Sequence, residues 1–115
     1  MNNLDNGINA GKYRHKINIY ETTIVTDSQG FQSEETKLVY SPHAEVVTTK
    51  GMTIYRNDSD FEKALTRFTI RYPKTVSINR KMWIEFRGKT YKIEYLNNID
   101  EADVELEIQA REVTH

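Results

Sequence analysis

The stretch MWIEFRGKTYKIEY, Met82–Tyr95, determines the fold that we predict. Apolar residues occupy every second position on both sides of Gly88, and this period-two alternation indicates two antiparallel strands with one buried face. Gly88 suits the turn between them because glycine accepts a positive φ at little steric cost. Since an isolated hairpin is only marginally stable in water, its apolar face needs further strands to cover it.

The rest of the chain supplies those strands. Alternating or extended patterns occur at Lys12–Glu21, Thr36–Tyr40, Ala44–Thr48, Phe68–Tyr72 and Val104–Ala110, with a turn signal at Asp27–Gly30 between the first two. The pair Ser59 and Glu62 has the spacing of a helix capping box, and Phe61 and Leu65 lie four apart, so we expect one short helix at Asp60–Leu65. The pattern predicts an all-β fold, a small antiparallel β-barrel of six or seven strands with one short helix.

Length and composition define the domain organisation. The 115 residues are enough for one domain with a modest core. We expect a flexible N-terminal arm at residues 1–10, a single β-barrel domain at residues 11–112 and a frayed C-terminus at residues 113–115. The arm is Asn-rich and has neither the basic flank nor the apolar segment of a secretory signal.

Composition also restricts the function. No apolar run approaches the roughly 20 residues that span a bilayer, so we expect no membrane contact. The absence of cysteine rules out disulfides, zinc–thiolate sites and cysteine catalysis. A net charge of −1 argues against a protein that binds nucleic acid over its whole surface, although a local basic patch stays open.

Candidate catalytic and metal-binding patterns are weak. The histidines His15, His43 and His115 are far apart in sequence and match no metal-binding spacing, so we interpret His15 as a structural residue on a core face. Oxygen ligands gather at residues 57–62, but the glycine that an EF-hand loop requires is replaced by Lys63, and helix capping explains the cluster more simply. No nucleophile or phosphate-loop motif occurs. We therefore predict a protein that is not an enzyme and needs no cofactor or metal.

Aromatic residues on strands leave a second interpretation open. Rings flanked by basic residues on a small β-barrel are typical of an OB-like domain that binds single-stranded nucleic acid. The aromatic residues concerned are Tyr13, Tyr20, Tyr72, Phe86 and Tyr91. Most of these rings alternate into the predicted core, which favours packing over base stacking.

Several motifs resemble those of a known family when they are taken together and in order. The opening Gly11–Ile19, GKYRHKINI, is similar to that of the phage head-tail adaptor or head-completion family. The turn Asp27–Gly30, the Ala44–Val46 strand, the Thr69–Tyr72 strand, the Met82–Ile93 hairpin and the Glu105–Ile108 ending resemble later family motifs. The helical segment that the family often has after its glycine is not matched after Gly51, so a loop and then a short helix are expected there.

The resemblance implies a structural neck protein of a tailed phage or prophage. Such a protein forms a homo-oligomeric ring, hexameric or dodecameric, below the portal or adaptor, and joins the capsid to the tail. In the stopper type it also closes the DNA channel, with non-specific contact to packaged DNA. The implied partners are the portal, the adaptor and tail proteins, and the implied location is the virion neck, with the host cytoplasm during assembly. The isolated chain is expected to be monomeric until assembly.

The stretch Thr48–Ser59 is the candidate channel loop. Long loops without regular structure are uncommon in compact domains and are often functional. Its candidate residues are Lys50, Gly51, Met52, Ile54, Tyr55 and Arg56. The two cations would contact phosphates without reading sequence, and the apolar side chains would pack against their copies across the ring.

Overall fold

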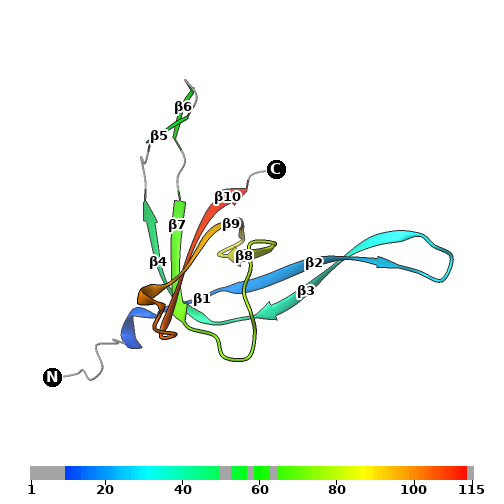
Figure 1. Cartoon of the computed structure of the whole chain (residues 1–115), viewed down its shortest axis with the longest axis horizontal. Coiled ribbons are helices and arrows are strands. Elements are labelled where there is room, and N and C mark those ends of the chain that lie inside the picture. Colours follow the sequence, from blue (N-terminus) through cyan, green and yellow to red (C-terminus); the bar gives the residue numbers. More distant parts are fainter. Residues whose placement is uncertain (1–9, 50–52, 57–58, 63–64, 114–115) are drawn as a thin grey trace.

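The chain forms a strongly curled antiparallel sheet, a half-barrel, from which a long hairpin projects (Figure 1). The structure is a computed structural model that describes residues 10–49, 53–56, 59–62 and 65–113. The eight strands of the sheet are β1 (His15–Lys16), β2 (Asn18–Thr26), β3 (Gln32–Tyr40), β4 (His43–Thr49), β7 (Leu65–Arg71), β8 (Met82–Phe86), β9 (Lys89–Asn98) and β10 (Glu105–Val113). Their order in the sheet is β1-β4-β7-β10-β9-β8-β2-β3. The all-β, antiparallel prediction is confirmed.

The central hairpin forms where the sequence predicted it. Strands β8 and β9 pair from Trp83 opposite Lys92 to Phe86 opposite Lys89, and a two-residue loop connects them. Both loop residues have positive φ, 54° at Arg87 and 77° at Gly88. Positive φ at both positions is the requirement of the tight turns that match the twist of paired strands.

The first strand is interrupted, and this interruption curls the sheet. Only Ile17 separates β1 from β2, yet β1 pairs with β4 at one end of the strand order, while β2 pairs with β8 near the other end. The Ile17 side chain is fully buried, and its backbone N–H donates to the Pro42 carbonyl oxygen at 3.0 Å. The chain thereby connects the two ends of the sheet through a single residue.

One apolar face of the sheet makes the core. Its largest fully buried side chains are Ile17, Ile19, Phe68, Ile70, Ile84, Ile93 and Ile108. The Phe68 ring packs edge-on against Phe86 and Tyr91, with centroids 5.9 and 5.2 Å apart. This arrangement explains the alternation in β8, in β10 and in the first half of β9, where each second residue faces the same core. A register shift between β9 and β10 then changes the phase, so that Leu96 packs against the core and Tyr95, which the alternation predicted to face it, is exposed.

The predicted helix and strand count are wrong. Instead of a helix over Asp60–Leu65, residues Ser59–Glu62 form strand β6, which pairs with β5 (Thr53–Arg56), and Leu65 begins β7. The described residues contain no α-helix, only 3-10 turns at Ala10–Lys12 (η2) and Ile99–Glu101 (η3). The sheet has eight strands and a second, two-stranded sheet lies between β4 and β7 in the sequence, where six or seven strands in total were expected.

The predicted chain ends lie largely outside the described residues. Of the N-terminal arm at residues 1–10, only Ala10 is described, and it begins η2. At the other end β10 continues to Val113, one residue into the segment expected to fray, and residues 114–115 are not described.

Candidate functional site

The projecting hairpin is the longest exposed stretch among the residues whose burial the structure describes. We call Thr22–Leu38 the hairpin arm. Strand β8 pairs with β2 only from Asn18 to Glu21, so beyond Glu21 the arm consists of β2 and β3 alone. Its turn is well ordered by Asp27, whose carboxylate oxygen accepts the backbone N–H groups of Gln29 and Phe31, both at 2.9 Å. Gly30 takes the positive φ of 87° that the turn needs.

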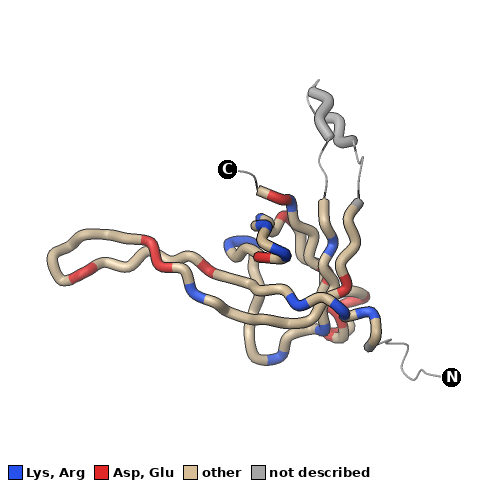
Figure 2. Tube along the Cα trace, turned by 180° about the vertical axis from the view of Figure 1, so that it is seen from behind, with Lys and Arg blue, Asp and Glu red and all other residues tan. Residues whose placement is uncertain are grey.

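The arm exposes apolar and acidic side chains among mostly uncharged polar ones. Ile24 is 62% exposed and Phe31 68% exposed. The arm also carries Asp27, Glu34 and Glu35 against a single cation, Lys37, and Figure 2 shows these acidic positions along its length. A two-stranded hairpin is marginal in water, and exposed apolar clusters usually mark a binding surface. The arm is therefore a candidate contact surface.

The base of the arm is held rigidly on the sheet. The Trp83 ring stacks on Tyr20, with centroids 4.6 Å apart and planes 20° apart. Its indole N–H donates to the Thr22 hydroxyl oxygen at 3.1 Å. Because Trp83 lies on β8 and the other two lie on β2, these contacts fix the direction in which the arm leaves the half-barrel.

A second uncovered region lies along β4. Strand β1 pairs only with His43 and Ala44, so the five residues Glu45–Thr49 pair with β7 alone. We call this side of β4 the β4 edge. Beside it is a hollow of about 220 Å³, lined by Lys12, Arg14, His15, Glu45, Val46 and Val47. Three of the six lining residues are basic, and the two valines supply an apolar floor. The β4 edge therefore presents unpaired backbone groups next to a basic hollow.

Buried hydrogen bonds fix the segment that forms the rim of this hollow. The Tyr13 hydroxyl donates to a carboxylate oxygen of Glu105 at 2.5 Å, and the Lys12 ammonium lies 2.7 Å from the same oxygen. The Arg71 guanidinium lies 5.2 Å from the centre of the Tyr13 ring. Burial, together with the hydrogen bond to Glu105, raises the pKa of Tyr13 well above its ordinary range. Although burial alone would raise the pKa of Glu105, the hydrogen bonds from Lys12 and Tyr13 lower it below the ordinary value.

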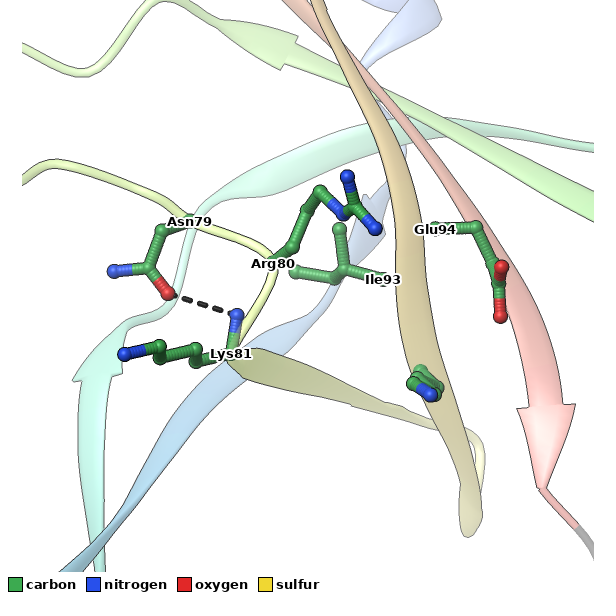
Figure 3. Close-up of a pocket in the computed structure, with 6 residues that line it drawn as sticks. Asn79, Arg80, Lys81, Ile93 and Glu94 are labelled. Atoms are coloured by element: carbon green, nitrogen blue, oxygen red, sulfur yellow. Dashed lines mark hydrogen bonds between the residues drawn. The ribbon is translucent and has the colours of Figure 1, made fainter.

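A basic hollow lies on another part of the surface, between the start of β8 and β9 (Figure 3). It measures about 690 Å³ and is lined by Asn79, Arg80, Lys81, Lys92, Ile93 and Glu94. The Asn79 side-chain oxygen accepts the backbone N–H of Lys81 at 2.9 Å, which fixes the loop that presents the two cations. Arg111 binds Glu94 at 3.3 Å. Three cations, Arg80, Lys81 and Lys92, therefore line one hollow, and their positive charge favours phosphate.

The candidate channel residues are only partly described. Lys50, Gly51 and Met52 lie outside the described residues. Ile54, Tyr55 and Arg56 belong to β5, with Tyr55 opposite Asp60 and Arg56 opposite Ser59 on β6. The stretch is therefore not a loop without regular structure, as the sequence suggested, because a strand pair occupies its described part.

The sequence predicted that the first strand and Thr36–Tyr40 form a long hairpin, and the structure confirms this pairing. Sequence reasoning missed the projection of this hairpin as an exposed arm, and it missed the basic hollow. The signal for the arm was the run Ile24–Val25 between threonines and the isolated Phe31, which continue the extended pattern up to the turn. The signal for the hollow was the adjacent pair Arg80–Lys81 and the outward-facing Lys92 on β9. A single sequence gives no distance between residues 80 and 92, so the two parts could not be joined.

The remaining predicted residues have structural roles. His15 is half-buried, and its ring packs edge-on against Phe86 at 5.6 Å. No group of three or more metal-ligating side chains occurs among the residues that the structure describes. Tyr13 and Tyr91 are buried, and Tyr20 is covered by Trp83, so these rings are not free to stack on bases. Within the same residues, no helix is long and apolar enough to cross a bilayer.

Uncovered strand edges and a projecting two-stranded arm are features typical of a protein that binds other chains. The family model described as phage head completion protein matches residues 8–113. The chain belongs to this phage head completion protein family, a family of non-enzymatic structural proteins. Family membership confirms the resemblance inferred from the sequence motifs. No curated protein matches the chain.

Two solved structures share the fold. One is a chain of the virion of a native gene transfer agent particle, with a TM-score of 0.63 and 16% sequence identity over 89% of this chain and 96% of that chain. The other is the solution structure of protein SF1141 from Shigella flexneri 2a, with a TM-score of 0.66 and 22% identity over 94% of this chain and 99% of that chain. Both likenesses extend over nearly the whole fold, including the curled sheet.

Proposed function

We propose that the protein is a subunit of a ring in the neck of a tailed phage or prophage, where it lies below the portal or adaptor and joins the capsid to the tail. The observation that carries the proposal is the family match over residues 8–113. Two further features support it. The fold resembles a chain found in a gene transfer agent virion, and the sheet leaves two separate edges uncovered.

The uncovered edges suit a ring. Strand β3 ends the strand order on one side, and β4 is covered by only two residues of β1 on the other. Soluble monomers usually protect exposed edges, because unpaired backbone groups recruit further strands. Two different surfaces on one subunit generate a head-to-tail contact, and a ring results when the rotation between subunits closes. The same contact would stay weak in isolated chains until the portal complex aligns them.

The stretch Lys50–Arg56 is the proposed channel segment. Its cations, Lys50 and Arg56, would contact packaged DNA, and Met52, Ile54 and Tyr55 would meet their copies across the ring. Deleting Lys50–Asn57 should leave the half-barrel folded and let DNA leak from filled heads. Normal DNA retention by particles that carry the deletion would refute the stopper role while leaving the joining role intact.

The basic hollow offers a second contact with DNA. Arg80, Lys81 and Lys92 line the hollow and are exposed, so they can contact phosphates without reading bases. Replacing all three by glutamate should abolish weak, salt-dependent binding of double-stranded DNA to the full chain, measured by fluorescence anisotropy at low and high salt. Replacing the exposed cation Lys37 and its neighbour Thr36 by glutamate on the acidic arm is the control. Unchanged binding by the triple variant would remove this surface from the proposal.

The decisive experiment is electron microscopy of portal–adaptor complexes, or of DNA-filled tailless heads, mixed with the purified chain. A new ring at the portal vertex supports the neck assignment and shows whether residues 50–56 face the channel. Absence of added density, with the protein folded in solution, would refute the assignment. Binding of single-stranded nucleic acid by the monomer would then favour the OB-like alternative, which the covered aromatic rings currently disfavour.

A further inference from the structure

We propose that the hairpin arm of one subunit docks on the β4 edge of the next subunit, so that β3 of the first extends the sheet of the second. The occupant of the β4 edge is a second copy of this chain. The inference rests on the ring proposed above and identifies the contact that builds it. Three observations support it: the hairpin arm and the β4 edge both have open backbone edges, opposite charges and exposed apolar side chains.

The two edges are of the same kind, and the edge on β3 is long enough to cover the edge on β4. Strand β3 pairs only with β2 along its whole length, Gln32–Tyr40. On β4, the five residues Glu45–Thr49, about 17 Å of strand, pair only with β7. Both edges have backbone N–H and C=O groups that point away from the partner strand. Adding one edge to the other satisfies both rows of groups, which is the usual way in which an extended segment binds an open sheet.

The charges of the two surfaces are opposite. The arm carries Asp27, Glu34 and Glu35 against Lys37. The segment beside the β4 edge carries Lys12 and Arg14, which line the hollow, and Lys16 in β1. Since Lys12 is paired with Glu105, the excess positive charge comes from Arg14 and Lys16 against Glu45. In Figure 2 the acidic positions follow the arm, and the basic ones gather near the start of the described chain. Opposite charges on two faces of one chain favour a head-to-tail contact, whereas a two-fold contact of arm with arm would place acid against acid.

The arm also has apolar surface that nothing in its own subunit covers. On the face that continues from Tyr20 and Trp83, Ile24 is 62% exposed and Leu38 50% exposed. On the receiving side Val47 is 37% exposed beside the hollow. Burial of these side chains would stabilise an arm that is only marginally stable alone, because beyond Glu21 it lacks a third strand.

The test uses the absence of native cysteine in the chain. One preparation of the full chain carries Thr36→Cys on β3, and a second carries Val47→Cys on β4. The two are mixed at high concentration, alone and with portal–adaptor complexes, and treated with a short bismaleimide. We expect the mixture to give at least about tenfold more covalent dimer than either variant alone, a preference that corresponds to roughly 1.4 kcal/mol. A Thr36–Thr36 dimer as the main product, or no excess over the single variants, would overturn the inference.

A charge exchange in the cross-linking pair tests the proposed orientation. We expect the yield of mixed dimer to fall by about tenfold when the Thr36→Cys chain also carries Glu34→Lys and Glu35→Lys, because these changes place cations against cations. Arg14→Glu with Lys16→Glu in the Val47→Cys chain should then restore it. The control pair Glu101→Lys with Glu112→Lys makes the same change of charge on exposed residues away from the arm and should leave the yield unchanged. Failure of the exchange to restore cross-linking would overturn the inference.

Failure of this contact and failure of the proposed function are distinguishable. If microscopy shows rings at the portal vertex but the Thr36 and Val47 variants do not cross-link in those rings, the subunit contact is refuted and the neck function stands. If microscopy shows no ring while cross-linking of the free chain persists, the contact stands and the neck function is refuted.

Discussion

Loss of the hydrogen bond between Tyr13 and Glu105 should destabilise the fold, because it connects the start of the described domain to β10, its last strand. Tyr13 is 8% exposed, and the Glu105 side chain is 16% exposed, so water cannot readily replace either partner. A hydrogen bond to a charged group in such a place contributes about 1.5–3 kcal/mol. We therefore expect Tyr13→Phe to lower the free energy of unfolding by about 2 kcal/mol and the melting temperature by about 8 °C.

A double-mutant cycle measures this contact. Tyr13→Phe, Glu105→Gln and the double variant are unfolded in urea and followed by the fluorescence of Trp83, the single tryptophan. The two changes should be non-additive by about 1 kcal/mol, because each removes the same hydrogen bond. The control Tyr95→Phe removes a hydroxyl from a tyrosine that is 51% exposed and should change stability by less than about 0.5 kcal/mol. Additivity of Tyr13→Phe and Glu105→Gln within about 0.3 kcal/mol would refute the reasoning.

Three other changes test the fold. Phe68→Ala empties the centre of the aromatic cluster and should lower the free energy of unfolding by about 3–5 kcal/mol in urea titrations; a loss below about 1.5 kcal/mol would place the core elsewhere. Gly88→Ala meets no atom within 4 Å, so only the φ of 77° opposes it, and calorimetry should show a loss of about 1 kcal/mol, of which Gly88→Asn recovers a part. Because the pKa of Glu105 is lowered in the folded protein, its contribution to stability is present above the ordinary carboxyl range and is lost as the pH falls through the folded pKa. Urea midpoints of Glu105→Gln should therefore fall less steeply with acidification than those of the parent, and parallel profiles would contradict this assignment.

The sequence was most informative where local and global preferences agree. The alternation around Gly88 specified β8, β9 and their turn, because burial on one face and a positive φ in the loop both leave direct traces in the residues. The same holds for β10, where Leu106, Ile108 and Ala110 all face the core. The all-β class and the family resemblance followed from such segments.

The errors came from signals that are weak or that depend on distant residues. The capping-box spacing of Ser59 and Glu62 is worth about 1 kcal/mol, too little to offset the cost of nucleating a helix of one or two turns. Pairing between β5 and β6 prevailed there. The break at Ile17 could not be predicted, because the predicted strand Lys12–Glu21 alternates without interruption. Only the positions of β4 and β8 show that its two halves pair at opposite ends of one sheet.

The candidate sites were harder to predict from the sequence than the fold. Exposure of Ile24 and Phe31 is visible only in the structure, where the arm leaves the half-barrel (Figure 1). The cations of the basic hollow are also separated by the whole of β8 in the sequence. Sequence reasoning placed the DNA contacts at residues 50–56 instead, a prediction that remains to be tested by the deletion described above.

The connection of both sheet ends through Ile17 has a consequence for how the chain folds. Strand β2 is synthesised early, but its partner β8 lies more than sixty residues further on, as in the pairing of Asn18 with Glu85. Contacts this far apart in sequence close slowly, because loop entropy is lost before any pairing is gained. During synthesis, one edge of β2 therefore has no partner strand until β8 has emerged from the ribosome. The half-barrel closes only near the end of synthesis. Premature association of nascent subunits is the hazard of this order, and it would be greatest when many copies are made at once.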